Sequence, residues 1–141
     1  MHEILKDFTV VEEMPIRWGD MDARGHVNNT IYYRYFESSR IALFRFFDIY
    51  EEPSKVRIGP ILSYQNCYYK APLTYPDIIY VGAKIARIEG SKIIIKHILV
   101  SKKLNRIVAE GEAHIIWYDY KKQKRINISD TLKEELLKSI N

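Results

Sequence analysis

The chain has 141 residues, of which 47% are hydrophobic and 28% charged. That length and composition are typical of one folded domain and exclude a disordered chain, so we expect a single domain over residues 1–141. No apolar run approaches the ~20 residues that a bilayer-spanning helix needs, and no membrane partner is expected. The first seven residues lack the basic and apolar regions of a signal peptide, which favours a cytoplasmic location.

The formal net charge is +4, and part of the excess lies in the basic run Lys121-Lys122-Gln123-Lys124-Arg125. Such a run can bind nucleic acid, or it can attract a small polyanion such as a phosphorylated coenzyme. We favour a solvated loop before the last helix, and no nucleic-acid partner is expected.

The first third of the chain predicts a strand, a loop and a long helix. Broken alternation over 8–18 predicts the strand, and 19–28 predicts the loop. Helical spacing of apolar residues then runs from residue 29 to about 47, with Asn28 or Asn29 as the expected N-cap. The residues expected on its apolar face are Tyr32, Tyr35, Phe36, Ser39, Leu43 and Phe46.

Four strands are expected after this helix, over 61–71, 77–88, 93–101 and 106–117. Short turn-forming segments separate the last three, which predicts an antiparallel meander. A short helix is expected over 129–140. Its cap is Ser129 or Asp130, or Thr131 in a capping box with Glu134.

Three small residues, Ala109, Gly111 and Ala113, share one face of the strand expected over 106–117. Small residues let a bulky group approach a sheet closely, and the aromatic helix is the obvious candidate. The expected fold is therefore α+β, with a curved antiparallel five-stranded sheet wrapped around one long central helix.

The segment between the first strand and the helix contains residues suited to acyl-transfer chemistry. Asp22 precedes a glycine turn, and Asn28 and Asn29 stand at the expected helix start, where N–H groups are unpaired and the helix dipole is positive. Acyl transfer needs a group that attacks or activates water and donors that hold an oxyanion. Asp22 is the leading candidate, although an aspartate at a turn also shapes the loop. The asparagines either cap the helix or offer a donor.

Other polar residues are weaker candidates. His26 is a possible general base or a structural loop residue. Glu37 lies two turns into the helix, and a solvated or Arg-paired carboxylate is the favoured interpretation. Asp20 stands beside the strand end, which favours a structural role. Cys67, the single cysteine, is expected to be a small apolar residue rather than a nucleophile.

The order of elements and the pattern Asp22-x-x-Gly25-x-Val27-x-x-x-x-Tyr32-x-x-x-x-Glu37 resemble the hotdog-fold acyl-CoA thioesterases, in particular the 4-hydroxybenzoyl-CoA thioesterase branch. The segment from His26 to Asn29 is also similar to a loop of acyl-ACP thioesterases, in which Asn stands at the position of Arg24. Residues 69–77 are similar to the family's strand–Pro–turn–Asp passage, with Pro where Gly is commoner.

The resemblance implies that Asp22 is a nucleophile or general base and that a backbone N–H near Asn29 is the oxyanion donor. It implies supporting roles for His26 and Glu37, an acyl-CoA substrate, and no metal or redox cofactor. Family members form dimers joined edge to edge, often paired into tetramers, and an open sheet whose edges need covering favours the same assembly.

Alternatives to an acyl-CoA thioesterase stay open. Arg24 makes an acyl-ACP substrate less favoured without excluding it. The hotdog fold also includes hydratases and dehydratases, and a non-catalytic acyl-ligand binding protein would share the same architecture. The sequence fixes neither the acyl group nor the choice between nucleophile and base.

Overall fold

The computed structural model describes residues 3–49 and 57–140. Two α-helices, two 3₁₀ turns and seven strands follow one another along these residues. In chain order they are η1 (Glu3–Asp7), β1 (Val10–Pro15), η2 (Trp18–Asp20), α1 (Asn29–Phe46), β2 (Ile58–Gln65), β3 (Tyr68–Tyr69), β4 (Ile78–Glu89), β5 (Lys92–Ser101), β6 (Arg106–Asp119), β7 (Lys124–Arg125) and α2 (Asp130–Lys138).

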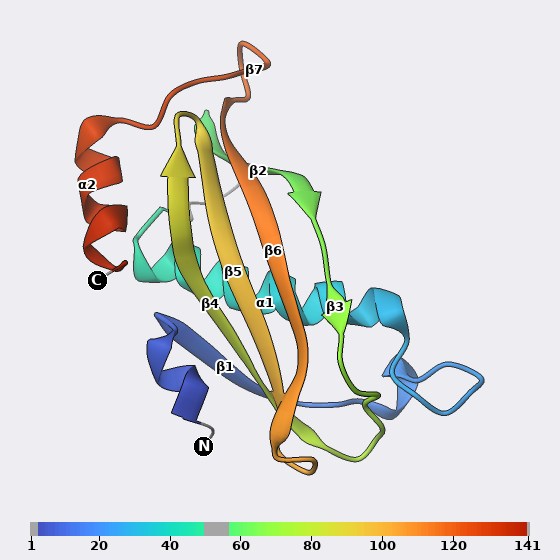
Figure 1. The fold of residues 1–141 in the computed structure, drawn as a ribbon. Helices are drawn as coiled ribbons and strands as arrows, with labels where there is room; N and C mark the ends of the chain where they lie inside the picture. Colours follow the sequence, from blue (N-terminus) through green and yellow to red (C-terminus); the bar gives the residue numbers. More distant parts are fainter. Residues whose placement is uncertain (1–2, 50–56, 141) are drawn as a thin grey trace.

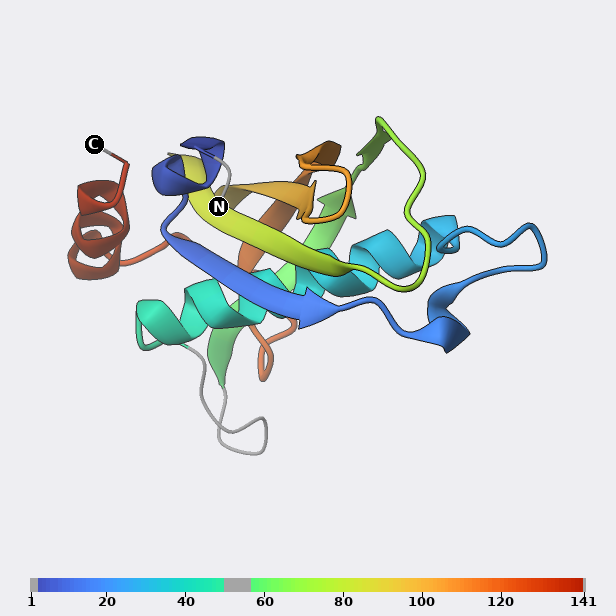
Figure 2. The ribbon, with the colours of Figure 1, turned by 90° about the horizontal axis from the view of Figure 1, so that it is seen from below.

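The strands form one antiparallel sheet in the order β1-β4-β5-β6-β2, and the two-residue strands β3 and β7 also pair with β6. The predicted meander of the last three long strands is β4-β5-β6, as expected. Figures 1 and 2 show the curved sheet with α1 running across one face and α2 at the end away from the helix start. The predicted α+β hotdog architecture is confirmed.

Helix α1 starts where a capping asparagine ends the preceding loop. The side chain of Asn28 accepts a hydrogen bond from the Thr30 N–H, which makes Asn28 the N-cap. The face predicted to be apolar is buried up to Leu43, but Phe46 is 60% exposed. That part of the prediction is wrong: Phe47 packs on the core instead, and the Phe46 ring meets it edge-on, with ring centroids 5.1 Å apart.

The small-residue face of β6 does receive the helix. Gly111 lies so close to Phe36 of α1 that a Cβ atom placed there would be 2.7 Å from the ring. The same Cβ would lie 2.3 Å from the backbone oxygen of Asn66. Glycine at this position therefore admits both the helix and the chain that follows β2.

A buried histidine joins α1 to the centre of the sheet. His97 of β5 is fully buried and stacks on Phe36, with ring centroids 4.9 Å apart. The Ser39 hydroxyl donates to the Phe36 carbonyl, so it accepts from His97 Nδ1–H at 2.9 Å. Nε2 then accepts from Arg40, 3.5 Å away. The network requires a neutral imidazole.

This histidine predicts a pH dependence of stability. Burial and the neighbouring Arg40 charge lower the pKa of His97 to about 3, whereas the pKa of a histidine in the unfolded chain is ~6.5. The unfolded state therefore binds the extra proton, and the stabilisation present above pH ~6.5 is lost as the pH falls toward the folded pKa, by up to ~1.4 kcal/mol per pH unit. The free energy of unfolding, measured with urea between pH 5 and 7, should depend less steeply on pH for His97→Asn than for the unchanged chain. Equal slopes would contradict the prediction.

The first strand is shorter than the predicted 8–18. Phe8 leaves the strand to pack on the opposite face of the sheet, where it contacts Ile98. At the other end, Trp18 begins η2, and the Asp20 side chain accepts a hydrogen bond from the Arg17 N–H. At both ends of β1, side-chain contacts thus take the place of hydrogen bonding to the neighbouring strand.

The strand predicted over 61–71 is divided into β2 and β3. Asn66 lies between them, and its side-chain oxygen accepts from the Glu112 N–H while its own N–H donates to the Glu112 carbonyl. The basic run is also more ordered than the loop favoured from sequence. Its residues form a turn that returns to β6 through β7, and the Asp119 carboxylate accepts from the Lys121 and Lys122 N–H groups.

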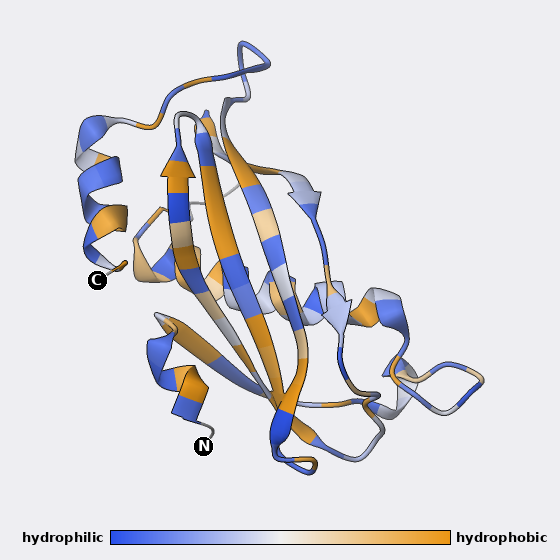
Figure 3. Cartoon of the chain, viewed as in Figure 1, coloured by the Kyte–Doolittle hydropathy of each residue, from blue (hydrophilic) through white to orange (hydrophobic). Residues whose placement is uncertain are grey.

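The C-terminal helix α2 is capped by Ser129, one of the three predicted caps, which accepts from the Leu132 N–H. Leu136 is its fully buried residue and joins the core beneath α1 and β4. Figure 3 shows apolar residues concentrated along β4 and β5 and polar residues over most of α2. Among the described helices, none has both the length and the apolarity needed to cross a bilayer.

Candidate active site

Residues 20–28 form a small hairpin that we call the Asp22 loop. Met21 bridges to Val27, the Asp22 N–H donates to the His26 carbonyl at 2.9 Å, and Gly25 closes the turn with a φ of 80°. One Asp22 carboxylate oxygen accepts from the Arg24 N–H at 2.9 Å. This turn fixes the carboxylate locally while leaving the side chain exposed.

The first N–H groups of α1 directly follow this loop in the chain. The Thr30 N–H is bound by the Asn28 side chain, and the Ile31 N–H by the Asn28 carbonyl. Within residues 3–49 and 57–140, the Asn29 N–H has no acceptor. The positive end of the helix dipole adds to the attraction of this N–H for an anionic oxygen.

A surface groove of about 310 Å³ lies against the helix start. His26 and Asn29 line it together with Tyr69, whose hydroxyl donates to the Asn29 carbonyl at 2.8 Å. Val27 and Ala71 contribute apolar surface. The groove therefore lies against Asn29 and offers space for a small organic group.

The structure brings only some of the predicted site residues together. His26 and Asn29 share the groove, whereas Asp22 is in the adjoining loop and outside the groove lining. Glu37 is exposed on α1, eight residues beyond Asn29, or about 12 Å along the helix axis. Its charge acts on Arg40, whose pKa is nevertheless lowered because burial outweighs that effect. Asp20 has the structural role favoured from sequence, since it binds Tyr35 and Arg17.

Two residues near the groove complete the description. Burial raises the pKa of the Cys67 thiol to about 11, so the thiol is protonated at neutral pH. Tyr69 itself was not a predicted site residue. Its contact with Asn29 joins positions 40 residues apart, and no local pattern in the sequence indicates it.

Among the described residues, no group of three or more His, Cys, Asp or Glu side chains is placed to bind a metal ion.

The fold is that of the hotdog thioesterases, as the resemblance implied. A family model of the thioesterase-like superfamily matches residues 16–136. The chain belongs to this superfamily, and its class is that of the thioester hydrolases.

Individual proteins are similar to this chain at low sequence identity. The long-chain acyl-CoA thioesterase FadM of Escherichia coli (strain K12) is 21% identical over 124 residues, which cover 88% of this chain and 94% of FadM. The PA2801 protein of Pseudomonas aeruginosa is 27% identical with a TM-score of 0.79, covering 89% of this chain and 95% of that one. The BH1999 gentisyl-coenzyme A thioesterase is 21% identical with a TM-score of 0.75, covering 87% and 98%.

Proposed function

We propose that this protein hydrolyses the thioester of an acyl-CoA to a carboxylic acid and free coenzyme A. The observation that carries the proposal is the Asn29 N–H at the start of α1, which has no acceptor among the described residues and directly follows the Asp22 loop in the chain. A thioester carbonyl placed in the adjoining groove can accept from this N–H while Asp22 acts on its carbon. The relatives named for acyl-CoA and gentisyl-coenzyme A substrates support the choice of coenzyme A.

The two proposed roles of Asp22 give the same products, but a different oxygen attacks the thioester carbon in each. As a nucleophile, the carboxylate attacks the carbonyl carbon, coenzyme A leaves as the thiolate, and water then cleaves the resulting anhydride. As a general base, it takes a proton from water, and the hydroxide attacks directly. In both cases the oxyanion accepts from the Asn29 N–H, and such a donor typically contributes about 10²–10³-fold in rate. His26, which lines the groove, has a supporting role.

A second copy of the chain is part of the proposal. The edge formed by β2 and β3 exposes a row of large apolar residues, and exposed apolar edges are normally covered. These residues are Ile58, Ile61, Leu62, Tyr64, Tyr68 and Tyr69. A partner along this edge would cover Tyr69, and with it the groove beside Asn29.

Leu62→Lys tests this assembly, because a charge on the edge strand opposes pairing. We expect the variant to shift from dimer or tetramer toward monomer in light scattering and to lose most thioesterase activity. Leu104→Lys is the matched control: Leu104 is 43% exposed, against 40% for Leu62, but lies in the turn between β5 and β6. It should keep both assembly and activity. A monomeric unchanged chain with full activity would contradict the proposed assembly.

Substrate class is tested by thiol release across aliphatic and aromatic acyl-CoAs, an acyl-ACP and an enoyl-CoA. We expect saturable thiol release from at least one acyl-CoA, with a lower kcat/KM for the acyl-ACP. Hydration of the enoyl-CoA without thiol release would favour a hydratase. Saturable binding without any reaction would favour an acyl-ligand binding protein. Single-turnover hydrolysis in ¹⁸O-water separates the two roles of Asp22, because only a nucleophile takes up the label in its own carboxylate.

A further inference from the structure

Asp20, at the foot of the Asp22 loop, joins three separate segments of the chain. Its carboxylate accepts from the Tyr35 hydroxyl at 2.8 Å and from the Arg17 N–H at 3.1 Å. Its backbone carbonyl accepts from the Asn28 N–H at 2.9 Å. Helix α1, the end of the first strand segment and the helix cap therefore meet at one residue.

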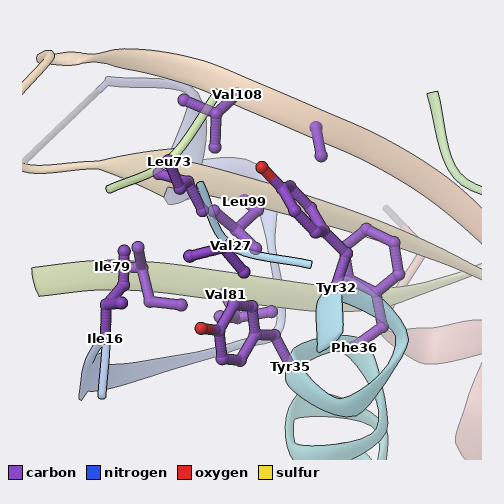
Figure 4. Close-up of a cluster of buried hydrophobic side chains, with 11 residues drawn as sticks. Ile16, Val27, Tyr32, Tyr35, Phe36, Leu73, Ile79, Val81, Leu99 and Val108 are labelled. Carbon is purple, nitrogen blue, oxygen red and sulfur yellow. The ribbon is translucent and has the colours of Figure 1, made fainter. Parts of the chain in front are cut away.

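The partner of Asp20 in the helix is a buried phenol. Tyr35 is 5% exposed and packs in the cluster that contains Val27, Leu73 and Val81. In Figure 4, Tyr32 and Tyr35 both project from α1 into this cluster. Burial and the Asp20 carboxylate raise the pKa of Tyr35 above its ordinary value, so the hydroxyl keeps its proton and donates.

These contacts connect the two groups assigned to catalysis. Asn29 and Tyr35 belong to the same rigid helix, six residues or about 9 Å apart along its axis. Asp22 is two residues from Asp20 in the loop. The hydrogen bond between Tyr35 and Asp20 therefore links the helix that begins at Asn29 to the loop that contains Asp22. The backbone hydrogen bond from Asn28 to Asp20 is a second link between the same two elements.

We propose that Tyr35 and Asp20 form a clamp that holds the Asp22 carboxylate in a fixed position relative to the Asn29 N–H. Tyr35 is then a positioning residue for thioester hydrolysis. The inference rests on the proposed roles of Asp22 and Asn29. Tyr35 touches neither the substrate nor the reacting atoms and acts through the placement of the loop. A displacement of about 1 Å at a reacting group can lower a rate by as much as ~10²-fold.

Tyr35→Phe removes the hydroxyl and keeps the ring in the core. We expect kcat to fall by about 10- to 100-fold while KM stays within about twofold, because the substrate still binds but the carboxylate is misplaced. Hydrogen exchange reports on the clamp without any activity: protection of the Asn28 and Asp22 N–H groups, which donate to Asp20 and His26, should fall in the variant.

Ser39→Ala is the matched control. Ser39 is a fully buried hydroxyl one turn further along α1, and its hydrogen bonds lead to Phe36 and His97 rather than to the loop. Its removal should lower stability and leave kcat and the exchange of the loop unchanged. Equal losses of kcat in Tyr35→Phe and Ser39→Ala would overturn the clamp, because both would then reflect general destabilisation.

A double substitution gives the decisive comparison. If Tyr35 acts by placing Asp22, then Tyr35→Phe should change the residual rate of Asp22→Asn by less than about twofold, since interacting sites are not additive. A full further loss in the double variant would overturn the inference. If the unchanged chain released no thiol at all, the proposed function would fail instead. Retained loop protection in Tyr35→Phe would still refute the clamp on its own.

Discussion

Asp22→Asn should lower kcat for acyl-CoA hydrolysis by about 10²–10⁴-fold, the usual range for removing a general base, and by at least as much if Asp22 is the nucleophile. The substitution changes little else. The remaining side-chain oxygen can still accept from the Arg24 N–H, which is the hydrogen bond that the Asp22 carboxylate makes among the described residues. We therefore expect the free energy of unfolding to change by less than about 0.5 kcal/mol.

Thiol release and urea unfolding, measured on the same preparation, check both halves of this prediction. Asp7→Asn is a suitable control, because Asp7 is an exposed aspartate in η1, before the first strand. Its kcat should stay within about twofold of the unchanged chain. Full activity in Asp22→Asn would show that Asp22 takes no part in the mechanism. His26, which lines the groove, would then be the remaining candidate base.

Gly111→Ala should cause a large loss of stability, about 3 kcal/mol, because the added methyl group enters a packed core. Its Cβ would lie 2.3 Å from the Asn66 backbone oxygen and 2.7 Å from the Phe36 ring. A backbone atom cannot rotate away as a flexible side chain can. Movement of Asn66 would also strain its two hydrogen bonds with Glu112.

Gly19→Ala is the control for this substitution. A Cβ at Gly19 would meet no atom within 4 Å, and its backbone needs no left-handed conformation. The change should therefore be neutral, or should stabilise the fold by about 0.4–1 kcal/mol by reducing the conformational entropy of the unfolded chain. Urea midpoints decide the matter, and equal midpoints for the two variants would show that the close approach at Gly111 is not needed.

The sequence predicts the long elements well because their periodicity is local. Helix α1 and the β4-β5-β6 meander repeat their apolar spacing over many residues, and a single sequence reports this directly. The break at Asn66 depends on hydrogen bonds to Glu112, 46 residues away. The departure of Phe8 from the first strand depends on a contact with the outer face of β4 and β5. Tertiary contacts of this kind leave no periodic signal.

The candidate site divides in the same way. Asp22 and Asn29 are indicated locally, by a glycine turn and a helix cap within one short segment. Their environment is not: the Tyr69 hydroxyl reaches Asn29 from a strand 40 residues later, and Tyr35 reaches Asp20 from the second turn of the helix. Glu37 fits the family spacing but does not line the groove, and its exposure on α1 agrees with the helical spacing, which leaves it off the apolar face.

The most direct test of the central claim is multiple-turnover hydrolysis of an acyl-CoA by the unchanged chain in ¹⁸O-water. We predict saturable turnover in which free thiol and carboxylic acid appear in equal amounts, with solvent oxygen incorporated into the acid. Saturable binding of acyl-CoA without thiol release, or thiol release without the labelled acid, would contradict the proposal that this protein is an acyl-CoA hydrolase.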